Sequence, residues 1–369
     1  MPLPVPRQID PVAPRARRPA LQDIRAAAAR IAGHVTCTPV LASPLLDARV
    51  RARVHAKAEP LQRSGSFKAR GAFNRLLTLD GSARRRGVVA YSSGNHGAAV
   101  ALAAHELGVP AAVVVPADTP ALKLATIRFY GAELHRYDPG QEDRLELAAA
   151  LARERGMTLV PPFDDPTVIA GQGTIGLELE QQAPGLDTVV VPVGGGGLIA
   201  GVGSALKALR PSIRIVGVEP AAGDDTARSI AAGRRLALPL APATIADGLR
   251  TLTPGELTFP INVGLIDAMV TVEDSDIAEA MRLCFELLKL VVEPSGAVAL
   301  AALTSGRLDV RGQAVGVVLS GGNVDAIRFS ELAALTADAA SANHTPARST
   351  NNAPAGGPTL EEGLICSED

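Results

Sequence analysis

The stretch T188-V-V-V-P-V-G-G-G-G-L-I-A200 joins a valine-rich run to four consecutive glycines and then to a helical pattern. Valine favours strands, and a strand without polar alternation is typical of a sheet that is covered on both faces. The glycines are therefore expected in a loop between a buried strand and the first turn of a helix. This arrangement predicts an α/β protein with mostly parallel sheets.

Similar apolar runs recur along the chain and alternate with longer helical patterns. The expected strands are residues 88–91, 111–115, 133–136, 158–160, 188–193, 213–218, 269–272 and 315–319. Expected helices include residues 96–107, 121–129, 141–155, 277–288 and 324–335. Ligands of parallel sheets bind at the carboxyl ends of the strands, and the glycine-rich stretches fall on loops of that kind.

The composition argues against several classes of function. Lys and Arg total 36 against 38 Asp and Glu, so no surface for nucleic acid or for a membrane is expected. Aromatic residues make up 3% of the chain, which leaves few rings for stacking on bases. No apolar run reaches the ~18 residues of a membrane-spanning helix. Three scattered cysteines (Cys37, Cys284 and Cys366) predict no disulfide framework and indicate a cytoplasmic protein.

The four glycines, Gly194 to Gly197, predict an anion site. Backbone N–H groups that no side chain covers, at the start of a helix, are a common phosphate cradle. The same stretch also matches the dinucleotide pattern G-x-G-x-x-A through Gly195, Gly197 and Ala200, with Glu219 ending the next expected strand. A nicotinamide-dependent dehydrogenase is therefore an alternative at this point.

The segment S92-S-G-N-H-G97 follows another expected strand and opens a helix. Its hydroxyl and N–H groups could bind a substrate carboxylate at the positive end of that helix. Simple capping of the helix by Ser93 or Asn95 is the alternative. His96 by itself is more typical of a structural histidine than of a catalyst.

Lys68 lies in S64-G-S-F-K-A-R-G-A72, where another helix is expected to start. Its small neighbours leave room for a flat ligand, and partial desolvation beside Phe67 would lower the pKa of the amine and make it a nucleophile for a carbonyl. A solvent-exposed lysine is the ordinary alternative. Together with a phosphate cradle and a carboxylate-binding loop, Lys68 favours pyridoxal phosphate and an amino-acid substrate, because a nicotinamide cofactor gives this lysine no role.

Seven motifs occur in a fixed order within residues 20–337. They are SGSFKARGA, SSGNHG, PFDDPTVIAGQGT, VGGGGL, ADGLR, EPSGA and LSGGNVD. Through them the chain resembles the fold-type II pyridoxal-phosphate enzymes, in the branch of the threonine/serine dehydratases and serine racemases. The resemblance implies a two-domain, tryptophan synthase β-like α/β fold with the cofactor in the cleft between the domains.

The resemblance also implies a role for each matched residue. Lys68 would be the Schiff-base lysine and the base that removes the α-proton. Phe67 would lie against the cofactor ring, Asn95 would bind its 3′-oxygen, and Ser320 would face the pyridine nitrogen. The residues implied for the cofactor phosphate are Gly194, Gly195, Gly196, Gly197 and Leu198. The residues implied near the substrate are Ser92, Ser93, Asn95, His96 and Arg144, and Ser93 is the second base in the racemase branch.

Ser320 bears on the type of reaction. A serine hydroxyl does not hold a proton on the ring nitrogen as a carboxylate would, so a short-lived carbanion and loss of a β-leaving group are favoured. The implied reaction is β-elimination from a 3-hydroxy amino acid of the L-threonine or L-serine class, which gives a 2-oxo acid and ammonia. A serine racemase that uses Lys68 and Ser93 as its two bases, and a non-catalytic amino-acid-binding relative, are the alternatives. The side chain beyond the β-hydroxyl stays open, with 3-hydroxyaspartate and phenylserine among the candidates.

A metal site is implied by Glu219, Gly223 and Asp225, which match the oxygen ligands of Mg²⁺ or Ca²⁺ in the racemase-like members. An acidic turn that caps a helix is the alternative.

The chain is expected to have two domains and two tails. Residues 20–87 and 164–337 would form the large cofactor-binding domain, and residues 88–163 a small mobile domain. The polar or proline-rich ends, residues 1–19 and 338–369, are expected to be disordered. The protein is expected to be a homodimer.

Overall fold

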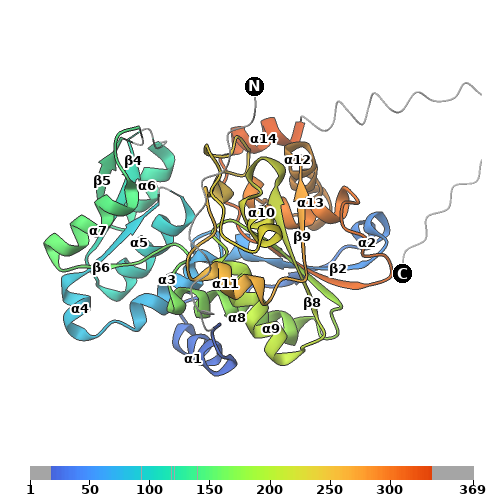
Figure 1. Cartoon of the computed structure of the whole chain (residues 1–369), viewed down its shortest axis with the longest axis horizontal. Coiled ribbons are helices and arrows are strands. Elements are labelled where there is room, and N and C mark those ends of the chain that lie inside the picture. Colours follow the sequence, from blue (N-terminus) through green and yellow to red (C-terminus); the bar gives the residue numbers. More distant parts are fainter. Residues whose placement is uncertain (1–17, 93, 118, 120, 139, 335–369) are drawn as a thin grey trace, which may run out of the picture.

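The structure is a computed structural model, and it describes residues 18–92, 94–117, 119, 121–138 and 140–334. Two separate sheets, each covered by helices, make up the described chain (Figure 1). The α/β fold with mainly parallel sheets is therefore as the sequence predicts. Apart from residues 18 and 19, the two expected tails lie outside the described residues, as does Ser93.

The larger sheet has six strands in the order β1-β2-β10-β7-β8-β9. Their bounds are Val40–Leu41, Arg53–Ala58, Ala314–Leu319, Thr188–Pro192, Arg214–Pro220 and Ala268–Val272 in that order. β1 pairs antiparallel with β2, and every other pair is parallel. The carboxyl ends of the five parallel strands therefore meet at one edge of this sheet.

Both faces of the six-stranded sheet are buried, which explains its valine-rich strands. In β7, Val190 packs into the hydrophobic cluster of helices α12 (Asp274–Leu283) and α13 (Pro294–Thr304). Its neighbours Val189 and Val191 pack into the cluster of α8 (Pro166–Gln182) and α9 (Gly197–Leu209). Successive side chains point to opposite faces of a strand, so a strand buried on both faces needs apolar residues throughout.

The smaller sheet has four parallel strands in the order β5-β4-β3-β6. Their bounds are Glu133–Tyr137, Ala111–Pro116, Val88–Tyr91 and Thr158–Leu159. Helices α5 (Asn95–Leu107) and α6 (Ala121–Phe129) pack on one face and α7 (Arg144–Arg155) on the other. This unit is the green and teal part at the left of Figure 1.

Helix α3 (Lys68–Leu77) lies between the two units. Its buried residues Phe73 and Leu76 share one hydrophobic cluster with Val100 of α5 and Val168 of α8. The remaining α-helices are α1 (Leu21–Ile31), α2 (Pro44–Val50), α4 (Gly81–Arg86), α10 (Asp225–Ala232), α11 (Thr258–Val263) and α14 (Ala326–Ala334). Short 3₁₀ turns are η1 (Glu59–Leu61), η2 (Ala221–Gly223) and η3 (Asp247–Leu249).

Several elements differ from the sequence-based prediction, and three of the differences have a clear local description. The helix expected at 277–288 is α12 followed by the π-helical turn η4 (Cys284–Leu288), which ends at Lys289 with φ +56°. The helix expected at 141–155 begins at Arg144, because the carboxylate of Asp143 accepts hydrogen bonds from the N–H groups of Leu145 and Glu146. Strands β1 and β2 are additions to the expected set. No helix within the described ranges is long and apolar enough to cross a membrane.

Candidate active site

The glycine loop connects β7 to α9 at the carboxyl edge of the six-stranded sheet. Gly196 has φ +88°, and α9 begins at Gly197, so free N–H groups of the first helical turn lie at the loop. A side chain at Gly195 would overlap the ring of Phe163, and one at Gly196 would lie 2.5 Å from Asn262 Nδ2. The loop is thus a close-packed turn that exposes backbone amides at the positive end of a helix.

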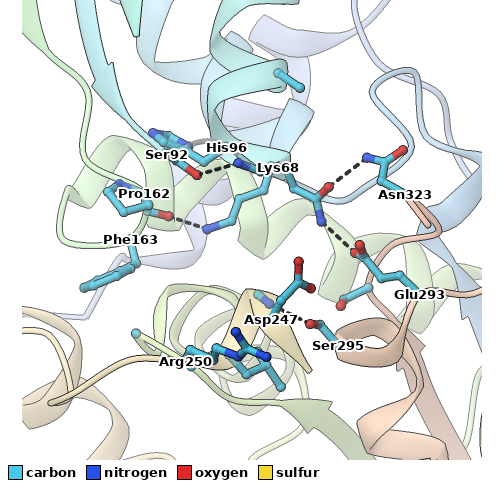
Figure 2. Close-up of a pocket in the computed structure, with 18 of the residues that line it drawn as sticks. Lys68, Ser92, His96, Pro162, Phe163, Asp247, Arg250, Glu293, Ser295 and Asn323 are labelled. Carbon is cyan, nitrogen blue, oxygen red and sulfur yellow. Dashed lines mark hydrogen bonds between the residues drawn. The ribbon is translucent and has the colours of Figure 1, made fainter. Parts of the chain in front are cut away.

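Lys68 is the first residue of α3. Its Nζ donates a hydrogen bond of 2.6 Å to the carbonyl oxygen of Pro162 (Figure 2). Nζ also lies 5.0 Å from the centroid of the Phe67 ring. Burial lowers the pKa of Lys68 to about 8. The neutral, nucleophilic form of this amine is therefore more accessible than that of a solvent-exposed lysine.

Asn95 opens α5 at the carboxyl end of β3, and its amide is held from the other unit. Its Nδ2 donates to Glu293 Oε1 at 2.6 Å, and its Oδ1 accepts from Asn323 Nδ2 at 2.7 Å. Asn95 therefore does not act as a cap of α5, whose N-terminal boundary residue is Gly94. The bond to Glu293 uses one of the two N–H groups at Nδ2, and no hydrogen bond to the described residues uses the other.

His96 is a buried, neutral imidazole. Its Nε2–H donates to the carbonyl oxygen of Val160 at 2.8 Å, because a carbonyl oxygen only accepts. Burial, together with the positive charge of Lys68, lowers the pKa of His96 to about 3. His96 therefore carries no charge at neutral pH.

Ser320 follows the last residue of β10 and lies next to the lysine loop. Its carbonyl oxygen accepts a hydrogen bond of 3.0 Å from Phe67 N, and Ser66 forms an antiparallel bridge with Gly321. The segment that carries Lys68 and the segment that carries Ser320 are thus tied together by backbone contacts.

Arg144 is the first residue of α7 and is exposed. It lies close enough to Tyr91, at the end of β3, to act on that phenol electrostatically. Burial nevertheless raises the pKa of Tyr91 to about 12, so its hydroxyl stays protonated.

One cavity of about 590 Å³ brings these residues together between the two units. The predicted site residues that line it are Phe67, Lys68, Ser92, Asn95, His96, Arg144, Gly194, Gly195, Gly196, Gly197, Leu198 and Ser320. Ser93, the predicted second base, lies outside the described residues. The cavity's size is in the usual range for a small-molecule or cofactor pocket.

Further residues line the cavity without having been assigned from the sequence. They are chiefly Pro162, Phe163, Asp247, Arg250, Glu293, Ser295 and Asn323 (Figure 2). All of them fall within motifs quoted above, so position in a motif was the available signal. Their contacts are with backbone or with residues far along the chain, as for Ser295 Oγ, which accepts from Gly248 N at 2.8 Å.

The three predicted metal ligands do not line this cavity. The carboxylate of Glu219 accepts hydrogen bonds from Thr226 N at 3.0 Å and Ala227 N at 2.9 Å, which caps α10. Burial and the charge of Asp225 raise the pKa of Glu219 to about 8, and burial raises that of Asp225 to about 7. The described residues contain no cluster of three or more His, Cys, Asp or Glu side chains that could hold a metal. What the structure shows there is a pair of buried carboxylates beside a helix start.

The known proteins that this chain resembles belong to a family that uses the cofactor expected at this site. The family model for pyridoxal-phosphate dependent enzymes matches residues 31–321. Serine racemase from Oryza sativa subsp. indica is 46% identical over 310 residues, which cover 83% of this chain and 91% of that protein. An L-threo-3-hydroxyaspartate ammonia-lyase from Pseudomonas sp is also 46% identical over 310 residues, covering 84% of this chain and 97% of that one.

A solved structure extends the likeness to the whole fold. The threonine deaminase from T.th. superposes with a TM-score of 0.78 at 50% identity and covers 83% of this chain and 99% of its own. The names of these relatives divide between racemase and ammonia-lyase. The chain belongs to the fold-type II pyridoxal-phosphate dependent enzymes, in the branch that holds the serine racemases and the threonine and hydroxyaspartate ammonia-lyases.

Proposed function

We propose that the chain is an ammonia-lyase that converts a 3-hydroxy amino acid of the L-threonine or L-serine class into a 2-oxo acid and ammonia. The observation that carries the proposal is the meeting of Lys68, Asn95, Ser320 and the glycine loop around one cavity. Two of the relatives named above are ammonia-lyases or deaminases, which supports the same reaction.

The residues present fit pyridoxal phosphate. The N–H groups of the glycine loop and of the α9 N-terminus would hold the phosphate, and Phe67 and Asn95 would hold the ring and its 3′-oxygen. Ser320 would face the pyridine nitrogen. When bound, this cofactor supplies the electron sink that accepts charge from the α-carbon of the substrate.

Lys68 would carry the cofactor and then take the α-proton at Nζ. Its lowered pKa leaves enough neutral amine for this task, and a base with a pKa near the working pH transfers protons efficiently. The carbonyl oxygen of Pro162 fixes the direction of Nζ within the cavity.

The substrate carboxylate would bind at the start of α5. Ser92 lies at this helix start, and the N–H groups of its first turn have no intrahelical partner. Arg144 adds a positive charge from the same unit of the molecule. His96 is uncharged and would contribute shape and hydrogen bonding rather than charge.

The reaction balances without a further reactant. The α-proton passes to Lys68 Nζ, and the β-hydroxyl leaves as water with a proton. The released enamine rearranges to an imine, which takes up one water and gives the 2-oxo acid and ammonia. One water is lost and one is gained, so no oxidant or reductant is needed.

A panel of 3-hydroxy amino acids tests this function. Purified protein should absorb near the cofactor's visible band and release 2-oxo acid from at least one of L-threonine, L-serine, 3-hydroxyaspartate and phenylserine. Lys68→Ala should lose both the release and the band of the lysine-bound cofactor. Full activity of Lys68→Ala, or no oxo acid from any member of the panel, would contradict the proposal.

A serine racemase is the second candidate. It is supported by the 46% identity to the Oryza sativa serine racemase and by the presence of Ser93 in the sequence. Ser93→Ala should abolish the interconversion of L- and D-serine and spare elimination from the L-substrate, since only the second base is removed. Equal loss of both activities would argue against Ser93 as a separate base.

We also propose a structural Mg²⁺ or Ca²⁺ held by the carboxylates of Glu219 and Asp225 and the carbonyl oxygen of Gly223. Both carboxylates are buried with raised pKa values, no ion pair to either is formed within the described part of the chain, and oxygen donors suit these ions. Added Ca²⁺ should raise the melting temperature of the wild type and not that of Asp225→Asn. An identical melting temperature with Ca²⁺ and with a chelator would argue against a metal at this site. Glu219 would then act only as the helix cap described above.

The organisation of the molecule completes the proposal. We infer a large domain of residues 20–87 and 164–337, a small mobile domain of residues 88–163, and a cytoplasmic homodimer. Cys37 and Cys284 are free thiols, which agrees with a reducing compartment. Light scattering during size-exclusion chromatography measures the mass of the protein and so tests the dimer. A smaller radius of gyration in small-angle X-ray scattering after substrate is added tests the domain movement.

A further inference from the structure

Three consecutive residues of the PFDDP motif contact three different parts of the site. They lie where the chain passes from β6 in the smaller unit to α8 in the larger one. Pro162 O accepts the hydrogen bond of Lys68 Nζ, and the ring of Phe163 fills the space above Gly195. The carboxylate of Asp164 accepts hydrogen bonds at the start of α11.

Asp164 holds the start of α11 by three hydrogen bonds, two from residues just before the helix and one from its first residue. Its carboxylate accepts from Glu256 N at 2.6 Å, Leu257 N at 3.2 Å and Thr258 N at 3.2 Å. Gly255 allows this approach, because a side chain at Gly255 would overlap the carboxylate. The nearby Arg235 supplies a positive charge. Helix α11 is short, so its position depends strongly on such a cap.

Helix α11 in turn holds the glycine loop. Thr258 Oγ1 donates to the carbonyl oxygen of Gly195 at 2.6 Å, and Asn262 Nδ2 donates to that of Gly196 at 3.2 Å. Thr258 and Asn262 are four residues apart and therefore lie on one face of the helix.

These two contacts orient the amides of the loop. In a planar trans peptide the C=O of one residue and the N–H of the next point in opposite directions. Anchoring the carbonyl oxygen of Gly195 on α11 therefore directs the N–H of Gly196 to the opposite side. The carbonyl oxygen of Gly196, held by Asn262 and also by Ala200 N at 3.0 Å, directs the N–H of Gly197 in the same way. Both glycines line the cavity, so that side is where an anion would sit.

We propose that Asp164 is a positioning residue for phosphate binding: through α11, Thr258 and Asn262 it sets the direction of the N–H groups of the glycine loop. The inference rests on the proposed seat of the cofactor phosphate in that loop. It gives the PFDDP motif, which lies about 30 residues before the glycine loop in the chain, a role in binding the phosphate of the cofactor.

The chain offers a matched control at the next residue. Asp165 also caps a helix, α8, by accepting from Thr167 N and Val168 N, and it pairs with Arg75. Asp164→Asn and Asp165→Asn therefore remove the same charge from adjacent positions, and each weakens one helix cap. Of the two helices, α11 is the one whose side chains hold the glycine-loop carbonyls through Thr258 and Asn262.

The experiment measures the affinity of each apoprotein for pyridoxal phosphate and for pyridoxal, which lacks the phosphate, and the ³¹P chemical shift of the bound cofactor. We expect Asp164→Asn to raise the Kd for pyridoxal phosphate by about tenfold or more, since charge-assisted hydrogen bonds are lost. Its Kd for pyridoxal should stay within about twofold of the wild type, and its ³¹P signal should move. Asp165→Asn should change neither the Kd ratio nor the ³¹P signal.

A second pair of variants gives the same test without removing a cap. Thr258→Val removes the hydroxyl that holds Gly195 and keeps the shape, and Thr258→Ser restores the hydroxyl. Thr258→Val should raise the Kd for pyridoxal phosphate more than the Kd for pyridoxal. Thr258→Ser should restore the wild-type Kd for pyridoxal phosphate. This pair decides the question if Asp164→Asn does not fold.

Three results would overturn the inference. One is an unchanged ³¹P signal and Kd in both Asp164→Asn and Thr258→Val. Another is an equal loss of pyridoxal and pyridoxal phosphate binding, which indicates general damage. The last is a wild type that binds pyridoxal phosphate no more tightly than pyridoxal. Wild-type protein that binds the cofactor normally but releases no oxo acid contradicts the proposed reaction alone, so the two failures can be told apart.

Discussion

Asn95 Nδ2 donates a hydrogen bond of 2.6 Å to Glu293 Oε1, although 198 residues separate the two in the chain. Asn95 belongs to the unit of the four-stranded sheet and Glu293 immediately precedes α13 on the six-stranded sheet. This contact therefore crosses the cavity and fixes the amide that would meet the 3′-oxygen of the cofactor.

Glu293→Ala should lower kcat/KM by about tenfold or more, because the Asn95 amide loses the carboxylate that orients it. Glu293→Gln keeps an acceptor oxygen in the same place and should retain most of the activity. Steady-state kinetics and the visible absorption maximum check both variants. Similar losses in the two variants would point to the charge of Glu293 rather than to its hold on Asn95.

Gly196→Ala should abolish cofactor binding. Gly196 has φ +88°, and a Cβ there would lie 2.5 Å from Asn262 Nδ2, so the loop must change shape. Gly185→Ala is the control, since Gly185 has a similar φ of +85° with open space around it. That variant should lose only about 1 kcal/mol of stability from the backbone conformation. Cofactor titration and thermal melting separate the two effects, and normal binding by Gly196→Ala would contradict the assigned cradle.

Arg144→Gln should raise KM for the amino acid several-fold and leave the Kd for pyridoxal phosphate unchanged. Arg144 lines the cavity from α7, where its charge can attract a carboxylate. Arg155, at the other end of the same helix, pairs with Glu133 outside the cavity, and Arg155→Gln should leave KM unchanged. An unchanged KM in Arg144→Gln would make Arg144 a surface residue without a role in binding.

Lys68 predicts a pH dependence of the stability of the cofactor-free protein. Burial lowers its pKa from 10.5 to about 8, so between these values the unfolded chain binds more protons than the folded one. The free energy of unfolding should therefore rise from pH 8 to pH 10.5, by on the order of 2 kcal/mol.

Lys68→Met should remove this rise, because no amine has to be buried in the fold. Lys207→Met, at a lysine that pairs with Asp267 near the surface, should keep it. Denaturant unfolding of the apoproteins at a series of pH values provides the measurement. A rise of equal size in Lys68→Met would assign it to other groups.

The parallel sheets could be predicted from the sequence because most of their strands are short, mainly apolar runs between helical patterns. Strand β2 has no such signature, because Arg53, His55 and Lys57 interrupt it with polar residues. Lys57 is nevertheless fully buried and donates to Glu178 Oε2 at 2.6 Å, a partner 121 residues away. A strand whose polar residues are satisfied by distant side chains gives no local sign of burial.

The site also combines residues that the sequence identifies with residues that it does not. Lys68, the glycine loop and Asn95 could be proposed because each lies in a stretch whose residue types suit a ligand. Asp164 gave no such signal, since its partners are the N–H groups of residues 256–258, which every sequence possesses. Contacts made by the backbone become visible only in the folded molecule.

Strand β10 has a consequence for how the protein is made. It lies between β2 and β7 and pairs with both, although Ala314 and its partner Arg53 are near opposite ends of the chain. During synthesis, the edges of β2 and β7 that pair with β10 stay unpaired until residues 314–319 have left the ribosome. The four-stranded sheet, built from residues 88–159, can assemble while translation continues. Nascent chains that stall before residue 314 would therefore carry one finished sheet and one that is exposed to aggregation.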